Sequence, residues 1–473
     1  MCRFIGRKRE LEAMNALYHR PGFQMTIMYG RRRVGKSTLL QRFVEGKKSI
    51  YYTAVRSSSQ RNLELLGNRV MEALAPAMKG LAFHSYEQLF SFVGERCRTE
   101  RIIFIIDEFP YMAEADKSLL SVMQKHIDTE WLHGNMYLFL CGSSVSFMED
   151  EVLSEKSPLY GRRTSQIAVK PFDFLEAAQF LPHYTPEEKA ITYGVTGGIA
   201  KYLALFDEKK SLDENLQELF FNNYGYMYEE PINILTQEFR SIASYSAIIE
   251  AVAAGRTKLN EIADLTKLEP STVSHAAANL VDTGILKKEY AITDESNKKK
   301  VRYQLADHMF RFWYQFVASH TDIIEIGEGR LHYENVVKPR ISNYMGEVFE
   351  DICRYYTLLL GAKGKLPCLV TKTGKWWGTN PEKKEETDID VVGLDIVNKQ
   401  AVIGECKFKN EALDKKVFDS LRDRHGLIDH RYRVVKFLLY SKSGFSDWIL
   451  EHQDNEDILA IDLETMYASI EAV

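Results

Sequence analysis

Two groups of residues in this sequence have the types and the spacing that phosphate chemistry requires. In the first, YGRRRVGKST, glycines, a lysine and a hydroxyl follow the spacing GxxxxGK[ST]. Glycines let backbone N–H groups turn toward a phosphate, the lysine reaches the β- and γ-phosphates of a nucleotide, and the serine hydroxyl binds Mg²⁺. We therefore expect a site for ATP and Mg²⁺ formed by Gly30, Arg33, Val34, Gly35, Lys36, Ser37 and Thr38.

The residues on either side of this loop predict the elements that must position it. The apolar run FQMTIMYG predicts a buried strand that ends at Gly30, and TLLQRFVEG has leucine and phenylalanine at helical spacing. The loop then lies between a strand and the N-terminus of a helix, which favours a bound anion. A chance glycine loop is the alternative interpretation.

Another apolar run, RIIFIIDEFPYM, predicts a buried strand that ends in Asp107 and Glu108. Beside a phosphate loop, Asp107 is expected to hold the Mg²⁺ shell, and Glu108 is expected to polarise the attacking water as a catalytic residue. Two acids at a strand end are otherwise most often a solvated turn. The neighbouring phosphate loop favours the catalytic interpretation.

Four further polar residues follow in the same part of the chain. Ser143 and Ser144 end the predicted strand MYLFLCGSS, where one of them could sense the γ-phosphate or only cap a turn. Arg162 and Arg163, in PLYGRRT, could stabilise the charge of a transferring phosphate or be ordinary surface arginines. The sequence leaves both alternatives open.

The second group consists of two carboxylates and a lysine near the C-terminus. Asp390 lies in TDIDVVGLDIV, and Glu405 and Lys407 lie in QAVIGECKF. If these runs form a hairpin that turns at Asn398 and Lys399, Asp390 falls directly opposite Lys407 and all three side chains share one face. Two such acids can bind one or two Mg²⁺ ions, and the lysine can stabilise the charge at a phosphodiester. An exposed ion pair across the two strands is the alternative.

Three short helices and a hairpin are predicted between the two groups, in SAIIEAVAAGR, KLNEIADLTK and EPSTVSHAAANLVDTGIL and then in LKKEYAIT and KKKVRYQLAD. This order is typical of a winged helix-turn-helix, whose third helix commonly enters the major groove of DNA. That helix has no lysine or arginine here; its polar candidates are Ser271, Thr272, Ser274, His275 and Asn279. The basic residues of the wing are Lys298, Lys299, Lys300 and Arg302. DNA binding and a docking role both stay open.

The first group resembles the archaeal-type P-loop ATPases, relatives of the STAND and AAA+ classes, over roughly residues 1–235. The resemblance includes FIGRKREL, similar to the family's box near the adenine, and VTGGIAKYL, similar to its lid motif. The family more often has Gly-Gly-Ile-Pro in the lid, and here Ala200 stands at the proline position. The resemblance implies roles in ATP binding and hydrolysis for Lys36, Ser37, Asp107 and Glu108, with Arg162 and Lys201 as further candidates.

The second group resembles the PD-(D/E)xK nuclease superfamily, in which an aspartate precedes a hairpin and an acid-x-lysine motif. The helix that contains GEVFE then supplies the superfamily's leading glutamate as Glu350, although Ile389 replaces the usual proline before Asp390. Over nearly the whole chain, RFWYQF, WWG and GECKFK are similar to ATPases that carry a DUF234 domain. The resemblance implies that Glu350, Asp390 and Glu405 bind metal and that Asp390, Glu405 and Lys407 are catalytic.

Length and composition limit the kinds of protein in which these sites can lie. A chain of 473 residues suits several domains, and a net charge of −5 means that contact with nucleic acid needs a local basic surface. The chain has no CxxC pair, no apolar segment of a signal peptide and no apolar run near ~20 residues. We therefore expect a cytoplasmic protein without membrane contact.

The expected fold class is α/β: a P-loop NTPase with an ASCE-type parallel sheet and a helical lid, a winged helix-turn-helix, and a C-terminal restriction-endonuclease-like α/β domain. The expected bounds are 1–170, 171–238, 239–315 and 316–473. We expect an Mg²⁺-dependent ATP-binding and hydrolysing protein whose nucleotide state controls a nuclease-like domain acting on DNA. The alternative is an ATP-dependent switch or transcription regulator with a non-catalytic docking domain. A protein partner or a homo-oligomer stays open.

Overall fold

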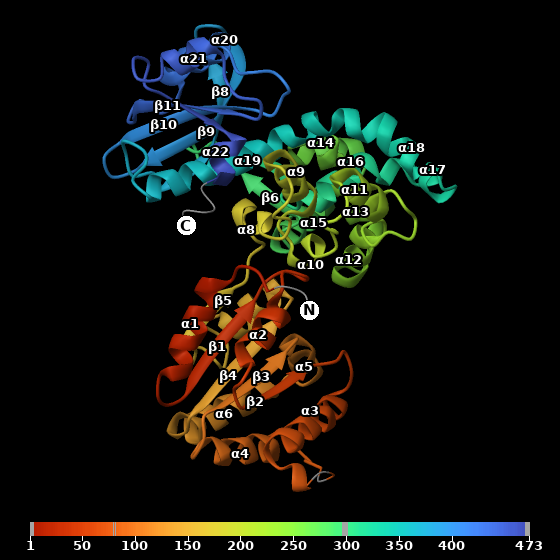
Figure 1. Ribbon diagram of the computed structural model, residues 1–473. Helices are drawn as coiled ribbons and strands as arrows, with labels where there is room; N and C mark the ends of the chain where they lie inside the picture. The colour runs from red at the N-terminus through yellow and green to blue at the C-terminus, as the bar shows by residue number, and fades with distance from the viewer. Residues whose placement is uncertain (1–3, 79, 81, 296–300, 469–473) are drawn as a thin grey trace. The chain divides into compact units, whose positions relative to one another are not determined.

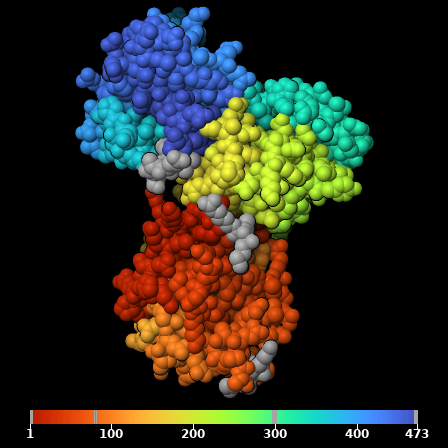
Figure 2. Space-filling model, in the orientation of Figure 1, coloured from red at the N-terminus to blue at the C-terminus, as the bar shows by residue number. Residues whose placement is uncertain are grey.

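The computed structural model describes residues 4–78, 80, 82–295 and 301–468. Its contacts divide the chain into two units. Unit 1 comprises Met1–Phe172 with Ile199–Tyr202, and unit 2 comprises Asp173–Gly198 with Leu203–Val473. In space-filling form, unit 1 is mainly red to orange and unit 2 runs from yellow to blue (Figure 2). The finer bounds at 170, 238 and 315 stay predictions.

Unit 1 is built on a parallel five-stranded sheet in the order β2-β3-β4-β1-β5 (Figure 1). β1, β3 and β4 are buried along their whole length, as expected of parallel strands that are covered on both faces. The strand order places β4 between β1 and β3, which confirms the parallel sheet predicted from the sequence. The strands are β1 Gln24–Tyr29, β2 Ser49–Thr53, β3 Ile102–Asp107, β4 Met136–Gly142 and β5 Ser165–Ala168.

The helices of unit 1 connect these strands and close the core around them. α2 shows why its sequence forms a packed helix, because its leucines and its phenylalanine recur at helical spacing and all three are buried. The helices are α1 Lys8–His19, α2 Lys36–Val44, α3 Ser59–Leu74, α4 Tyr86–Cys97, α5 Phe109–Ala115, α6 Leu119–Thr129, α7 Val145–Phe147 and α10 Ala200–Leu203, whose last residue is assigned to unit 2.

The first part of unit 2 is helical. Its helices begin with strong caps, such as Thr185 before α9 and Ser211 before α11, each paired with a glutamate three residues later. The elements are α8 Phe174–Ala178, α9 Pro186–Thr196, α11 Leu212–Phe220, α12 Glu230–Glu238, α13 Ile242–Ala253, α14 Leu259–Thr266, α15 Pro270–Asp282, β6 Leu286–Glu289, β7 Arg302–Leu305, α16 His308–Phe316, α17 Thr321–Glu325 and α18 Gly329–His332.

Three helices, α13 to α15, precede the antiparallel β6–β7 hairpin in the order that the sequence predicted. Three of the predicted basic wing residues, Lys298, Lys299 and Lys300, lie outside the described residues. The fourth, Arg302, begins β7. The identification of this segment as a winged helix stays a prediction.

The C-terminal part of unit 2 is a mixed five-stranded sheet in the order β12-β11-β10-β9-β8 (Figure 1). β8, β9 and β10 are antiparallel neighbours, and β10, β11 and β12 are parallel. The long helix α19 packs against β8, β9 and β10, and α20 buries Phe418 and Leu421 in the core of the same sheet. The elements are α19 Ile341–Ala362, β8 Lys372–Asn380, β9 Glu385–Asp395, β10 Gln400–Lys407, α20 Lys415–Asp423, β11 Arg433–Ser441, α21 Asp447–Glu451, β12 Ile458–Asp462 and α22 Leu463–Ala468.

The β9–β10 hairpin forms as predicted, but its register differs from the prediction. Asp395 pairs with Gln400, so the turn contains four residues. The Asp395 carboxylate accepts hydrogen bonds from the backbone N–H groups of residues 397 and 398, and Lys399 takes a left-handed φ of 55°. The prediction that Asp390 lies directly opposite Lys407 is therefore wrong by two residues. An even shift keeps each side chain on its face of the sheet.

Within the described ranges, none of the helices combines the length and the apolar character that crossing a lipid bilayer requires.

Candidate functional site

The phosphate loop of unit 1 has a backbone that requires glycine at two positions. Gly30 adopts a φ of 152°, and a Cβ added there would lie 2.2 Å from the carbonyl oxygen of Val169, next to β5. Gly35 adopts a φ of 95° at the start of α2, where an added Cβ would touch Ala200 at 3.4 Å. These glycines let the chain turn sharply between β1 and α2, as the sequence motif predicted.

Lys36 is the first residue of α2, and its almost fully buried side chain lies inside this loop. Its Nζ donates hydrogen bonds to the carbonyl oxygens of Gly30 at 2.7 Å and Arg31 at 3.0 Å. Burial lowers the pKa of its ammonium group, and the nearby charges of Glu108 and Asp107 oppose that shift. The ammonium is thus held inside the loop by backbone oxygens, next to the two acidic residues at the end of β3.

Ser37 and Asp107 come together as the sequence predicted. The Ser37 Oγ donates a hydrogen bond to the Asp107 Oδ2 at 2.7 Å, and Tyr51 on β2 donates a second hydrogen bond to the same oxygen at 2.8 Å. Burial and the Asp107 charge raise the pKa of Tyr51, so its hydroxyl remains a donor. A hydroxyl and a carboxylate are ligands that Mg²⁺ prefers, so this pair fits the predicted ion.

Glu108 is the next residue after Asp107 and has an unusual backbone. Its φ of 51° lies in the left-handed region, which a glutamate rarely adopts. The carboxylate accepts hydrogen bonds from the Ser143 Oγ at 2.7 Å and from the Ser143 N–H at 3.3 Å. Of the two serines considered from the sequence, Ser143 is therefore the one that contacts an acid of the site.

The predicted lid motif returns to the phosphate loop within unit 1. The N–H of Lys201 donates to the carbonyl of Arg33 at 3.2 Å, and Ala200 lies against Gly35. Arg162 instead forms two hydrogen bonds of 2.7 Å with Asp128. The roles of Arg162 and Lys201 in hydrolysis stay predictions.

Two supporting residues were not predicted from the sequence. One is Tyr51, whose contact with Asp107 depends on the strand order. The other is Arg7, which is buried, donates to the carbonyls of Val34 at 3.0 Å and Lys170 at 2.7 Å, and stacks on Phe172 at 4.1 Å. Arg7 lies in the motif FIGRKREL, so this motif could have indicated Arg7 from the sequence.

In unit 2, the carboxylates of the second group lie among basic side chains. Lys375 on β8 places its Nζ 3.0 Å from Glu350 Oε2, 2.9 Å from Asp388 Oδ2 and 3.6 Å from Asp390 Oδ1. Arg354, one turn beyond Glu350 on α19, contacts Glu350 at 3.3 Å and the Asp390 carbonyl at 2.8 Å. We call Glu350, Asp388, Asp390 and Lys375 the carboxylate cluster.

Glu405 has separate basic partners beside this cluster. Its two carboxylate oxygens accept hydrogen bonds from Lys407 at 2.6 Å and from Arg424 at 2.7 Å. Although burial lowers the pKa of Lys407, the charges of Glu405 and Asp390 outweigh it and raise that pKa. The sequence thus predicted the neighbourhood of Asp390, Glu405 and Lys407. Three basic side chains were missed. Lys375 and Arg424 are far in sequence from the acids that they contact, and Arg354 lies one turn from Glu350 but is far in sequence from Asp390.

The residues of this region do not fit a divalent metal ion in the conformation described. Across the described ranges, no group of three or more His, Cys, Asp or Glu side chains is arranged to hold a metal ion. The lysine ammonium already contacts the three acids of the carboxylate cluster. Burial, with the charge of Asp390, raises the pKa of Glu350 to about 7.

The predicted DNA-reading helix, α15, has an open face of small polar side chains. Ser271, Thr272 and His275 line a shallow groove together with Ser241, Ser244 and Tyr245. Asn279 instead donates a hydrogen bond to the Tyr245 hydroxyl at 2.8 Å. The exposed face therefore offers hydroxyl and imidazole groups but no cation.

Two family models match separate segments of the chain. Residues 4–206 match a family described as an ATPase domain predominantly from Archaea, and residues 313–418 match DUF234, described as archaeal and bacterial proteins of unknown function. An uncharacterized protein of Methanocaldococcus jannaschii is 29% identical over 465 residues, which cover 98% of this chain and 99% of the relative.

Two shorter or more distant likenesses concern nucleotide-binding proteins. An uncharacterized ATP-binding protein of the same archaeon is 44% identical over 45 residues, or 10% of this chain and 76% of the relative. The solved structure of a Walker-type ATPase from Pyrococcus abyssi is similar with a TM-score of 0.48 and 20% identity, covering 66% of this chain and 96% of that one.

Proposed function

We propose that this chain, whose residues 4–206 match an ATPase domain predominantly from Archaea, is an Mg²⁺-dependent ATPase whose nucleotide state controls how unit 2 engages DNA. The observation that carries the ATPase part is the hydrogen bond between Ser37 and Asp107 beside Lys36. These three side chains supply the hydroxyl, the carboxylate and the ammonium that Mg²⁺-ATP requires.

Each residue of the site has a distinct part in this proposal. When ATP binds, the Lys36 ammonium leaves its hydrogen bonds to the loop carbonyl oxygens and binds oxygens of the β- and γ-phosphates. The N–H groups of the loop bind the β-phosphate. Ser37 and Asp107 would hold Mg²⁺, which neutralises charge on the phosphates when bound. Glu108 orients the attacking water, and its hydrogen bond to Ser143 fixes the carboxylate until the γ-phosphate arrives.

The role of unit 2 is tested by DNA binding in defined nucleotide states. We expect Glu108→Gln, which retains ATP, and Lys36→Ala, which does not bind it, to differ in their mobility shift of duplex DNA. Binding should weaken steeply with salt if the contacts are to phosphates. Equal binding by both variants with and without ATP would contradict control by nucleotide.

A non-catalytic C-terminal domain is the second candidate, and a specific observation favours it. Lys375, Arg354, Lys407 and Arg424 already neutralise the acids that a metal-dependent nuclease would use. We infer that the domain docks DNA or a protein in this conformation, and the nuclease activity predicted for Asp390, Glu405 and Lys407 stays a prediction. Mn²⁺-dependent cleavage of single- or double-stranded DNA that disappears in Asp390→Ala would contradict the docking role.

A further inference from the structure

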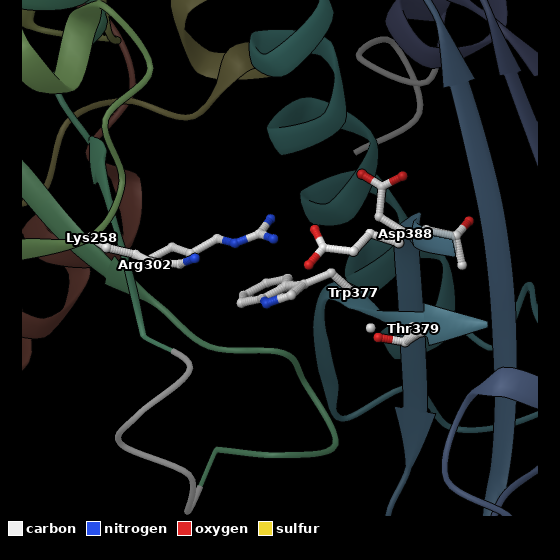
Figure 3. Close-up of a pocket in the computed structure, with 8 residues that line it drawn as sticks. Lys258, Arg302, Trp377, Thr379 and Asp388 are labelled. Atoms are coloured by element: carbon white, nitrogen blue, oxygen red, sulfur yellow. The ribbon is translucent and has the colours of Figure 1, made fainter. Parts of the chain in front are cut away.

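A pocket of about 380 Å³ lies within unit 2, between two walls that come from different parts of the sequence (Figure 3). Sites for small ligands occupy about 300–1,000 Å³, so this pocket is large enough for a nucleotide. One wall contains Lys258, which precedes α14, and Arg302, which begins β7. The other wall belongs to β8 and β9 and includes Trp377, Thr379, Glu386 and Asp388.

The pairing of β8 with β9 places the residues of the second wall on one face of the sheet. Trp377 pairs with Asp388, and Thr379 pairs with Glu386. Directly paired residues point to the same face, and so do residues two apart along one strand. An indole ring, a hydroxyl and two carboxylates therefore border the same space.

Arg302 is the cation that reaches into this space. Its guanidinium carbon lies 4.6 Å from the centre of the Trp377 ring, and Figure 3 shows the two groups facing each other. In the part of the chain that the structure describes, this guanidinium has no hydrogen bond and no ion pair. Its five N–H donors are thus available to an anion such as phosphate. Lys258, with a side chain that is 58% exposed, adds a second positive charge to this wall.

The two acids of the opposite wall differ in their partners. Asp388 already contacts the Lys375 ammonium at 2.9 Å. A β-bulge directs this lysine, because two positions of β9, 390 and 391, lie opposite Lys375 alone. Glu386 is exposed and has no basic partner among the described residues. Its carboxylate is therefore free to accept hydrogen bonds from a ligand, while it repels a phosphate toward the basic wall.

A nucleotide supplies the groups that match these walls. Unpaired bases stack on aromatic rings and on arginine guanidinium planes, and their phosphates bind arginine and lysine. Carboxylates accept hydrogen bonds from the N4 amino group of cytosine, whereas thymine has an oxygen at the corresponding position, which a carboxylate repels. In a duplex the pairing edge of the base is occupied, so only an unpaired base can present it to Glu386.

We propose that this pocket binds an unpaired, amino-bearing base of single-stranded DNA, which stacks on the pair formed by Trp377 and Arg302 and donates its amino group to Glu386. Arg302 and Lys258 bind the adjoining phosphate. A strand is favoured over a free nucleotide because both cations belong to the segment that is predicted to bind DNA.

This inference rests on the proposed engagement of DNA by unit 2 and names the form of DNA that is bound. Its readout is binding of single strands without ATP. Loss of the pocket's preference would leave nucleotide-controlled binding of duplex DNA intact. Conversely, single-strand binding that ignores ATP would contradict the control by nucleotide and not the pocket.

The first test compares two strands on the full chain without nucleotide. Fluorescence anisotropy measures the affinity for labelled oligodeoxycytidine and for oligothymidine of the same length, which carry the same phosphate charge. We expect the natural protein to bind oligodeoxycytidine about tenfold more tightly, as a hydrogen bond to a charged group provides. Equal affinities would overturn the proposal. Competition by free deoxycytidine monophosphate at the same nucleotide concentration would overturn the strand as the source of the base.

Arg302→Ala tests the basic wall. It removes a stacking surface and a phosphate contact, so the affinity for oligodeoxycytidine should fall by at least about tenfold. The matched control is Lys372→Ala, because Lys372 forms an ion pair with Glu295 in another contact between the β6–β7 segment and β8, outside the pocket lining. An equal loss in Lys372→Ala would overturn the proposal, since it would assign the effect to packing of the hairpin or to general charge.

Glu386→Ala tests the recognition of the base with Arg302 left in place. Removal of the exposed carboxylate should make the affinities for oligodeoxycytidine and oligothymidine equal, whatever its effect on general attraction of DNA. Glu385→Ala removes the neighbouring exposed acid, which does not line the pocket, and should keep the preference of the natural protein. An unchanged preference in folded Glu386→Ala would overturn the proposal.

Discussion

The Ser37 hydroxyl donates a 2.7 Å hydrogen bond to the Asp107 carboxylate, although the two residues are 70 positions apart in the sequence. The contact follows from the parallel sheet, because the loop after β1 and the carboxyl end of β3 lie at the same edge. It joins a residue in the first turn of the helix after the phosphate loop to the residue that ends the acidic strand. ATP binding and hydrolysis by unit 1 therefore depend on the residues at this edge of the sheet.

Tyr51 holds Asp107 from the neighbouring strand, so we predict a positioning role for its hydroxyl. Tyr51→Phe removes one donor to the Asp107 carboxylate and should raise the Mg²⁺ concentration needed for half-maximal ATP hydrolysis by about tenfold, equivalent to one hydrogen bond of ~1.4 kcal/mol to a charged group. Magnesium titrations at saturating ATP measure this. Tyr52→Phe, whose hydroxyl contacts Asn62, is the matched control and should leave the Mg²⁺ requirement unchanged.

Glu108 is predicted to act on the chemical step and not on binding. Glu108→Gln should reduce the ATP turnover rate by about 10²–10⁴-fold, because the amide cannot accept a proton from water, while the ATP affinity stays near that of the natural protein. Single-turnover hydrolysis and a fluorescent nucleotide titration separate the two quantities. Loss of nucleotide affinity equal to the loss of turnover would show that Glu108 serves binding instead.

The raised pKa of Glu350 leads us to predict that the stability of unit 2 depends on pH. Burial, reinforced by Asp390 and opposed by Lys375 and Arg354, raises its pKa from an ordinary value of 4.5 to about 7. The folded protein then keeps a proton that the unfolded chain releases, so the free energy of unfolding falls as pH rises from about 4.5 to about 7. Over this range the fall is ~1.4 kcal/mol at most for each pH unit.

Thermal unfolding from pH 4.5 to 8 measures this effect. Glu350→Gln should flatten the fall of the midpoint temperature, since glutamine does not titrate. Glu347→Gln, an exposed position on the same helix, should retain the slope of the natural protein. A slope in Glu350→Gln as steep as that of the natural protein would assign the effect to another group.

Lys287 is expected to stabilise the contact between the hairpin and α19. Its Nζ contacts both oxygens of Asp351 at 3.0 and 3.2 Å, and Arg354 contacts Asp351 at 2.6 Å. Although burial raises the pKa of Asp351, these cations outweigh it and hold that pKa well below its ordinary value. Lys287→Ala should lower the free energy of unfolding by on the order of 1 kcal/mol, because Arg354 still contacts the Asp351 carboxylate.

Denaturant unfolding checks this prediction, with Lys288→Ala as the control. Lys288 is the next residue of β6, and its Nζ lies 6.0 Å from the centre of the Tyr303 ring. Its removal should change the stability of unit 2 much less. If the two substitutions lowered the free energy of unfolding equally, the ion pair between Lys287 and Asp351 would have no specific stabilising role.

The phosphate loop and the acidic strand could be predicted from the sequence because β1 and β3 are continuous apolar runs with polar residues at their ends. Tyr51 could not be predicted, since its contact depends on β2 lying next to β3. The register of the β9–β10 hairpin was missed because the Asp395 side chain stabilises a four-residue turn. No local pattern indicates the bulge that directs Lys375 to Glu350 and Asp390.

The central claim is that unit 1 binds and hydrolyses ATP through Lys36, and release of phosphate from ATP tests it most directly. With Mg²⁺ present, the natural protein and Lys48→Ala, which alters an exposed lysine in unit 1, should hydrolyse ATP at similar rates. Lys36→Ala should neither bind nor hydrolyse ATP. Hydrolysis by Lys36→Ala at the rate of the natural protein would contradict the claim.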